Sequence, residues 1–238
     1  MPQSRDRTTN PDGVSSGGAT SWHSALHGAE SRWPAFAAAL VIIVGQTLVA
    51  SSLQLRPVWL LPGVAALLLL MSIGIYVSPA KPGRIARMVS IGLAGVLVTA
   101  NVVSLALLVR GVFVGSDLSP INLLGTGVAL WAVSVLVFAI VYWELDGGGP
   151  EARLERRREF PDLVFPQQQS DQEKLTSADW QPSFGDYLYV SLTAGTAFSP
   201  TDTMPYTKGA KLAMGVQSTL SFVIAAMLVA RAINIAKG

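Results

Sequence analysis

Long apolar runs with almost no charged residues limit what this chain can fold into more than any other feature. Crossing the roughly 30 Å hydrocarbon core of a bilayer takes about 20 mostly apolar residues in a helix. The helix is required because that core offers no water to the backbone N–H and C=O groups. Five runs are of this length: Pro34–Ser52, Val58–Ser78, Ile85–Val109, Leu123–Trp143 and Leu212–Ala230.

The charge content supports the same interpretation. Only 13% of the residues are charged, against roughly 25% in a typical soluble domain. Trp33, Trp59, Tyr142 and Trp143 lie near the ends of the apolar runs, which is typical of aromatic residues at a membrane interface. The sequence therefore predicts an all-α integral membrane protein, a bundle of about six transmembrane helices.

The sixth helix of this count is the stretch Phe184–Phe198, which is apolar but short. Its 15 residues would reach only about 22 Å as a helix, and Pro200 interrupts it. Two alternatives stay open: a short sixth crossing, or a re-entrant helix that enters and leaves on one side.

The distribution of basic residues bears on that choice. With six crossings, most of the 17 Lys and Arg residues fall on the side of the N-terminus, as expected for the cytoplasmic side. This favours six crossings, with both termini in the cytoplasm and the chain in the cell (inner) membrane. Four regions follow: a disordered polar tail over 1–32, four transmembrane helices over 33–144, a polar and cytoplasmic segment over 145–183, and the short or re-entrant helix plus the last transmembrane helix over 184–238.

Several classes of protein are excluded or disfavoured. There is no cysteine, so disulfides and thiolate metal sites are absent, and a net charge of +2 does not indicate a nucleic-acid partner. His23 and His27 have no third metal ligand nearby. The glycines Gly147–Gly149 lack the Gly-Lys-Ser/Thr ending of a phosphate loop and are interpreted as a flexible exit from the membrane. With no visible nucleophile and base pair, we predict no enzyme activity, no metal and no cofactor.

Polar residues in and after the last two apolar stretches are the candidates for a pore or solute path. Broken helices at membrane depth are tolerated where they are buried in protein or line a cavity, and the polar residues of the last run are dense. Packing between helices is the competing interpretation. The candidates are Thr193, Thr196, Ser199, Thr201, Asp202, Gln217, Ser218 and Ser221.

Two stretches carry a resemblance to known proteins. Tyr142–Pro150 (YWELDGGGP) and Ala197–Pro205 (AFSPTDTMP) resemble recurring stretches of a family of uncharacterised bacterial multi-pass inner-membrane proteins. The resemblance covers roughly Trp33 to the C-terminus and implies no particular activity.

The C-terminal part also resembles the pore module of potassium channels, in which a pore helix leads to a filter, an Asp and a final helix. The matching filter residues would be Ala197–Asp202. Ser199 and Thr201 stand where that filter has glycines, which turn backbone carbonyls toward the ion. The departure removes the basis for potassium selectivity.

Two functions therefore stay open. The first is a pore or carrier for a small solute or ion. The alternative is a non-transporting membrane scaffold or partner subunit that acts through residues 145–183. The expected partner is the lipid bilayer, and homo-oligomerisation stays open.

Overall fold

The protein is described from a computed structural model, which covers residues 31–53, 57–78, 83–114, 120–155, 157–158, 160–169, 180–196 and 202–237. Within these ranges, five helices are long and apolar enough to cross a membrane. The predicted all-α membrane bundle is confirmed. The five helices are α2 (Trp33–Ser52), α3 (Leu60–Val77), α4 (Arg84–Val114), α5 (Pro120–Leu145) and α9 (Lys208–Lys237).

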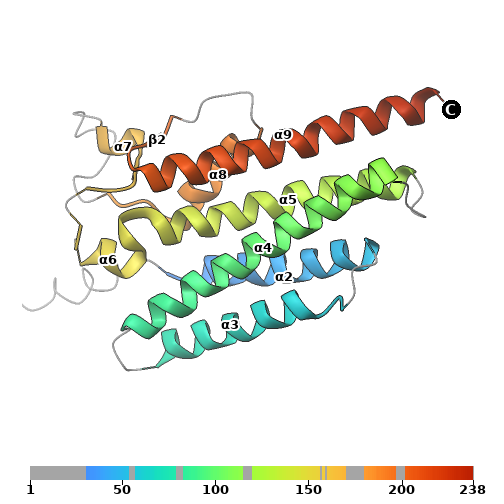
Figure 1. Cartoon of the computed structure of the whole chain (residues 1–238). Helices are drawn as coiled ribbons and strands as arrows, with labels where there is room; N and C mark the ends of the chain where they lie inside the picture. Colours follow the sequence, from blue (N-terminus) through green and yellow to red (C-terminus); the bar gives the residue numbers. More distant parts are fainter. Residues whose placement is uncertain are drawn as a thin grey trace, which may run out of the picture. The chain divides into compact units, whose positions relative to one another are not determined.

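Helix α5 lies at the centre of the bundle (Figure 1) and packs against α2, α4, α9 and the short helix α8 (Phe184–Thr196). Helix α3 packs against α2 and α4 on the side away from α9. Apolar side chains such as Ile42, Leu97 and Val137 are fully or almost fully buried between these helices. Because helices need close packing to associate in lipid, this core fixes how they are arranged.

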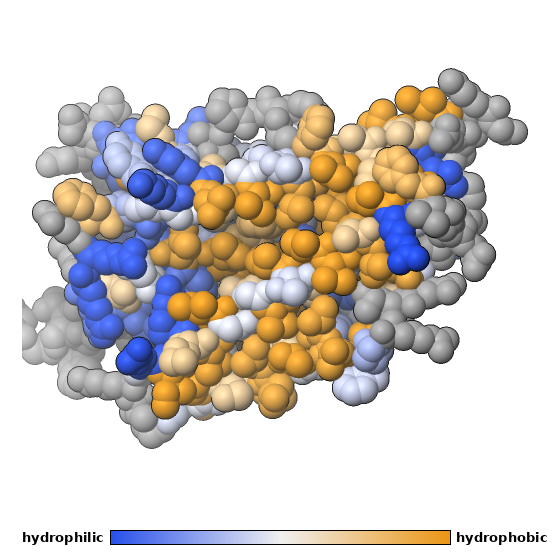
Figure 2. Space-filling model, in the orientation of Figure 1, coloured by the Kyte–Doolittle hydropathy of each residue, from blue (hydrophilic) through white to orange (hydrophobic). Residues whose placement is uncertain are grey.

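The outer surface of the helices is also largely apolar. Leu40, Leu70, Leu212 and Phe222 are each more than half exposed, and Figure 2 shows a continuous area of hydrophobic side chains over the long helices. Soluble monomers rarely expose apolar patches of this extent. A surrounding bilayer accounts for the exposure.

Helices α8 and α9 both run antiparallel to α5. The hydroxyl of Tyr187, near the start of α8, lies 2.7 Å from a carboxylate oxygen of Asp146, directly after the end of α5. Gly195, near the end of α8, accepts a hydrogen bond from Trp131, further back along α5. For α9, Gly209 lies beside Leu145 at the end of α5 and Leu228 lies beside Gly127 near its beginning. The two helices are therefore parallel to each other and start at the same end of the bundle.

Helix α8 consequently has the re-entrant geometry rather than that of a crossing. It has 13 residues and reaches only about 20 Å. After α8 the chain forms strand β2 (Met204–Pro205), which pairs antiparallel with β1 (Leu163–Val164). Strand β1 lies beside the end of α5, since Leu163 donates to Asp146. The chain has therefore returned to the end of the bundle where α8 began. The prediction left both alternatives open, and this return of the chain to the end where α8 began is the geometry expected of the re-entrant one.

The preferred count of six crossings would place both termini on one side, whereas the described chain begins and ends at opposite ends of the bundle. Arg32 forms an ion pair with Glu151, so α2 begins at the end where α5 finishes. Helix α9 begins at that same end and finishes at the opposite one (Figure 1). We call the end where α2, α4, α8 and α9 begin the charged end, and the opposite one the far end.

Short elements cover the charged end of the bundle. They are η1 (Asp146–Gly148), α6 (Pro150–Leu154), β1 and α7 (Pro166–Gln169). The glycines predicted as a flexible exit form a defined turn, in which Gly147, Gly148 and Gly149 all have positive φ. This backbone ends α5 and turns the chain into α6.

Candidate functional site

The re-entrant helix is held inside the bundle by a buried network centred on Gln217 of α9. Its Nε2 donates to the backbone oxygen of Ser191 on α8 over 2.7 Å and to the Ser191 hydroxyl over 2.8 Å. Its Oε1 accepts a hydrogen bond from the Tyr142 hydroxyl of α5. The Ser191 hydroxyl donates to the carbonyl of Val135, also on α5. These bonds tie α5, α8 and α9 together at membrane depth.

Gly195 allows α8 to approach its neighbours closely. A Cβ at this position would lie 3.2 Å from Gln217 Nε2 and 3.3 Å from a methyl carbon of Val135. The Gly195 carbonyl accepts a hydrogen bond of 3.1 Å from the Trp131 indole. Small residues at helix contacts permit such approaches in membranes, and here one positions the inner end of the re-entrant helix.

The structure brings only some of the predicted path residues together. Gln217 and Ser221 are buried against α8. The hydroxyl of Ser218 lies 3.4 Å from the carbonyl of Ala194. Gln217 has partners for both ends of its amide, and these partners lie on two other helices, α5 and α8.

The remaining candidates lie on or after α8. The Thr193 and Thr196 hydroxyls donate to carbonyls of α8 itself. Thr196 and Asp202 are exposed. Ser199 and Thr201, like His23 and His27, lie outside the described residues.

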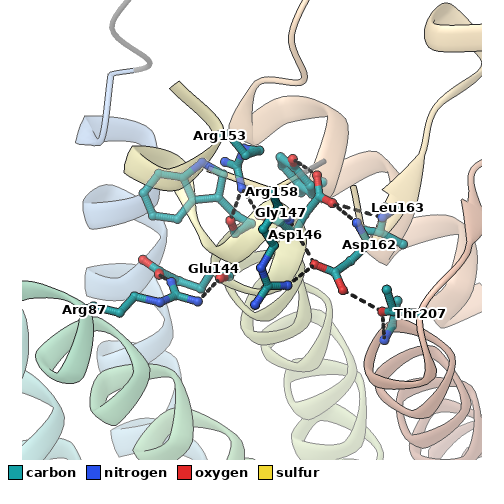
Figure 3. Close-up of polar contacts among 12 residues, drawn as sticks. Arg87, Glu144, Asp146, Gly147, Arg153, Arg158, Asp162, Leu163 and Thr207 are labelled. Atoms are coloured by element: carbon teal, nitrogen blue, oxygen red, sulfur yellow. Dashed lines mark hydrogen bonds and ion pairs between the residues drawn. The ribbon is translucent and has the colours of Figure 1, made fainter. Parts of the chain in front are cut away.

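A second network, which we call the aspartate network, joins the elements of the charged end (Figure 3). One Asp146 carboxylate oxygen accepts the backbone N–H groups of Asp162 and Leu163 over 2.7 and 3.0 Å, and the other accepts the Tyr187 hydroxyl over 2.7 Å. One carboxylate oxygen of Asp162 in turn accepts a hydrogen bond of 3.0 Å from the backbone N–H of Gly147. Its other oxygen accepts the hydroxyl of Thr207 over 2.6 Å. The network therefore links the end of α5 to β1, α8 and the start of α9.

Arginine side chains bind carbonyl groups at the end of α5 and in the turn that follows it. The last four C=O groups of a helix have no partner within it. Arg153 donates to the carbonyls of Trp143 and Asp146 over 2.6 and 2.8 Å. Arg87 of α4 donates to the carbonyl of Glu144 over 2.6 Å and also pairs with its carboxylate (Figure 3). Positive charge is also favourable here because of the helix dipole.

Sequence reasoning missed most of these residues. Tyr142, Ser191, Asp146 and Asp162 were not candidates, because a residue's partners are set by the fold rather than by spacing along the chain. One signal was present: Asp146 and Glu144 are acidic residues directly at the end of an apolar run, and burying them requires partners.

Comparison with known proteins gave no match to a family model, to a curated protein or to a solved structure.

Proposed function

We propose that the chain is a pore or carrier for a small ion, with its path beside the inner end of α8. The observation that supports this most is the re-entrant geometry of α8. A helix that ends at membrane depth is tolerated where the chain around it is buried or lines a cavity. Short helices that end within the membrane are a recurring way to bind ions there.

The direction of α8 favours a cation. The helix begins at the charged end and its C-terminus lies inside the bundle. The C-terminal end of a helix carries a partial negative charge from its carbonyl groups. Asp202, an exposed carboxylate beside β2, adds negative charge where the chain returns. An anion would be repelled by both features.

We further propose that the charged end faces the cytoplasm. By the positive-inside rule, short cytoplasmic segments are rich in Lys and Arg. Among the side chains that the structure describes, the basic ones at the far end are Arg110 and Arg231. The basic ones at the charged end are Arg32, Arg84, Arg87, Arg153, Arg157, Arg158, Lys208 and Lys211. The re-entrant helix would then enter from the cytoplasm, whereas the pore helix of a potassium-channel module enters from outside.

This topology predicts a specific pattern of cysteine labelling. The chain has no cysteine, so Gln169→Cys in α7 and Ala236→Cys in α9 can each be labelled without background. In intact cells treated with a membrane-impermeant maleimide, we expect Ala236→Cys to react and Gln169→Cys to be protected until the membrane is opened. Protection of both positions would mean that α8 or another segment crosses, and labelling of Gln169→Cys alone would reverse the proposed orientation.

The pore proposal predicts cation flux that depends on Asp202. Protein in vesicles should conduct K⁺ or Na⁺, followed by a dye that reports the compensating proton movement. Replacing Asp202 by Asn should lower that flux several-fold, because a carboxylate at the mouth of a path raises the local cation concentration.

The matched control is Glu155→Gln, which removes the same charge from an exposed residue at the same end. It should leave flux unchanged. Flux no higher than in protein-free vesicles would contradict the proposal, and equal flux in both variants would remove Asp202 from the path.

The scaffold alternative has less support. Residues 145–183 were the segment expected to contact a partner. The part that the structure describes uses its charged groups within the chain: Asp162 binds Gly147, Arg158 and Thr207, and Arg157 pairs with Glu155. These contacts favour a role in holding the re-entrant helix.

A further inference from the structure

A groove of about 550 Å³ lies between the end of α2 and the beginning of α5, at the far end of the bundle. All of its described lining residues except Val49 and Thr126 are exposed, so a molecule outside the protein can reach it. None of them belongs to α8 or to the two networks, and the groove is therefore separate from the proposed ion path. The lining residues are Leu48, Val49, Ser51, Ser52, Ile121, Asn122, Gly125, Thr126 and Ala129.

The space exists because α2 and α5 approach closely at one level and leave room at the next. A Cβ at Gly45 of α2 would lie only 2.6 Å from a methyl carbon of Val133 on α5. About two turns nearer the beginning of α5, a Cβ at Gly125 would meet nothing within 4 Å. Gly125 and Ala129 both line the groove, and their side chains are too small to fill it.

Two serine hydroxyls in the lining present hydrogen-bond acceptors. A hydroxyl has one hydrogen to donate and two lone pairs that accept. Ser51 and Ser52 donate that hydrogen to the carbonyl of Leu48 over 2.8 and 2.9 Å, and both residues are exposed. What they offer to a molecule in the groove is therefore an acceptor oxygen each, which a donor can reach.

The charge around these hydroxyls favours a cationic donor. Helix α2 ends at Ser52, and the C-terminal end of a helix carries a partial negative charge from its carbonyl groups. None of the described lining residues is charged, so no basic side chain of the lining opposes a cation. A small positive group with several N–H donors, such as a primary ammonium, matches both the acceptors and the charge.

We propose that the groove binds one membrane phospholipid whose head group carries a primary ammonium, as in phosphatidylethanolamine. The ammonium, with three N–H donors as in a lysine side chain, bonds to the hydroxyl oxygens of Ser51 and Ser52, where α2 ends. An acyl chain lies deeper in the membrane, along Gly125 and Ala129. A volume of about 150 Å³ holds a molecule of benzene size, so the groove holds the head group and part of a chain.

Other lipids fit the groove less well. Phosphatidylcholine has the same net charge, but its ammonium is fully methylated and has no N–H to donate. A lipid with net negative charge would meet the partial negative end of α2 and no Lys or Arg among the described lining residues. The recognition is therefore carried by the N–H donors, which two lipids with identical acyl chains can test.

The probes are dioleoyl-phosphatidylethanolamine and dioleoyl-phosphatidylcholine, titrated into the full-length protein in detergent and followed by native mass spectrometry. We expect saturable binding of one phosphatidylethanolamine per chain, with phosphatidylcholine at least roughly tenfold weaker. A difference of this size corresponds to the loss of one or two hydrogen bonds to a charged group. Equal affinity for the two lipids would overturn the proposal.

Removing the acceptors tests the head-group contact. Ser51→Ala combined with Ser52→Ala should abolish the preference, so that both lipids bind equally weakly. The matched control is Thr99→Val combined with Thr219→Val, which removes two exposed hydroxyls that also donate to carbonyls of their own helices. The control should keep the preference. A preference that survives in the serine variant would overturn the proposal.

Filling the groove tests its position. Gly125→Leu should abolish saturable binding of both lipids. Gly215→Leu should leave it intact, because Gly215 is likewise an exposed helical glycine whose Cβ would meet nothing within 4 Å. If Gly125→Leu does not fold, Ala129→Leu fills the same groove. Lipid binding unchanged in both filling variants would overturn the proposal. So would a dimer without bound lipid that Gly125→Leu dissociates, since the groove would then receive a second copy of the chain.

Discussion

Replacing Asp146 by Ala is expected to destabilise the protein by more than about 3 kcal/mol. Asp146 is 1% exposed, and its carboxylate accepts three hydrogen bonds from the backbone of Asp162 and Leu163 and from the hydroxyl of Tyr187. Each buried donor left unpaired costs about 1–3 kcal/mol. Because the donors lie on β1 and α8, their loss should also loosen the attachment of the re-entrant helix.

Thermal unfolding of the purified protein in detergent measures this effect. For a chain of this length, the expected change corresponds to a fall in Tm of roughly 6–12 °C. Glu155→Ala is the control, because it removes an exposed carboxylate at the same end and should change Tm little. Asp146→Asn keeps one acceptor oxygen and should fall between the two. An Asp146→Ala protein as stable as Glu155→Ala would show that the aspartate network contributes nothing.

The membrane fold could be predicted because its main signal is local. Twenty apolar residues in a row define a span without reference to any other part of the chain, and each of the five predicted runs coincides largely with a helix. The length of Phe184–Phe198 likewise placed a re-entrant helix among the alternatives. What length could not decide was the direction of α9 relative to α8, which depends on contacts such as that between Gln217 and Ser191.

Counting basic residues does not decide between five and six crossings. With five crossings, Lys208 and Lys211 move to the charged end, and Arg231 and Lys237 move to the far end. The charged end keeps most of the basic residues in either case, so the positive-inside rule hardly separates the two arrangements. The polar contacts of α8 instead give its direction relative to α5 and α9.

Only part of the candidate site could be predicted, because a sequence shows which residues are polar but not which residues they contact. The polar stretch of α9 was singled out as a candidate solute path, and in the structure Gln217 and Ser221 of this stretch are buried against the re-entrant helix. The function of Gln217 as a link between helices depends on Tyr142, which is 75 residues away in the sequence. Asp146 depends in the same way on Tyr187, 41 residues away. Spacing along the chain carries no information about such pairs.

Gly149→Ala is expected to be the most damaging single-methyl change at the charged end. Gly149 has φ 99° and ψ 171°, a region that is essentially restricted to glycine and costs other residues about 1–3 kcal/mol. A Cβ there would lie 2.3 Å from Nη1 of Arg87, so the Arg87 side chain would have to leave Glu144. Strain and the broken pair together should cost about 3 kcal/mol or more, again measured as a fall in Tm. Gly215→Ala, where a Cβ meets nothing within 4 Å, should not destabilise the protein.

The two contributions at Gly149 can be separated by adding Arg87→Ala. Arg87 supplies both the atoms that the new methyl group would meet and the positive charge beside Glu144. With Arg87 already removed, Gly149→Ala should cost only the backbone strain, so the two changes together should be less damaging than the sum of the single variants. Coupling of this kind is expected for residues in contact. Strictly additive losses would mean that the methyl group does not displace Arg87, and that strain in the turn after α5 accounts for the whole effect.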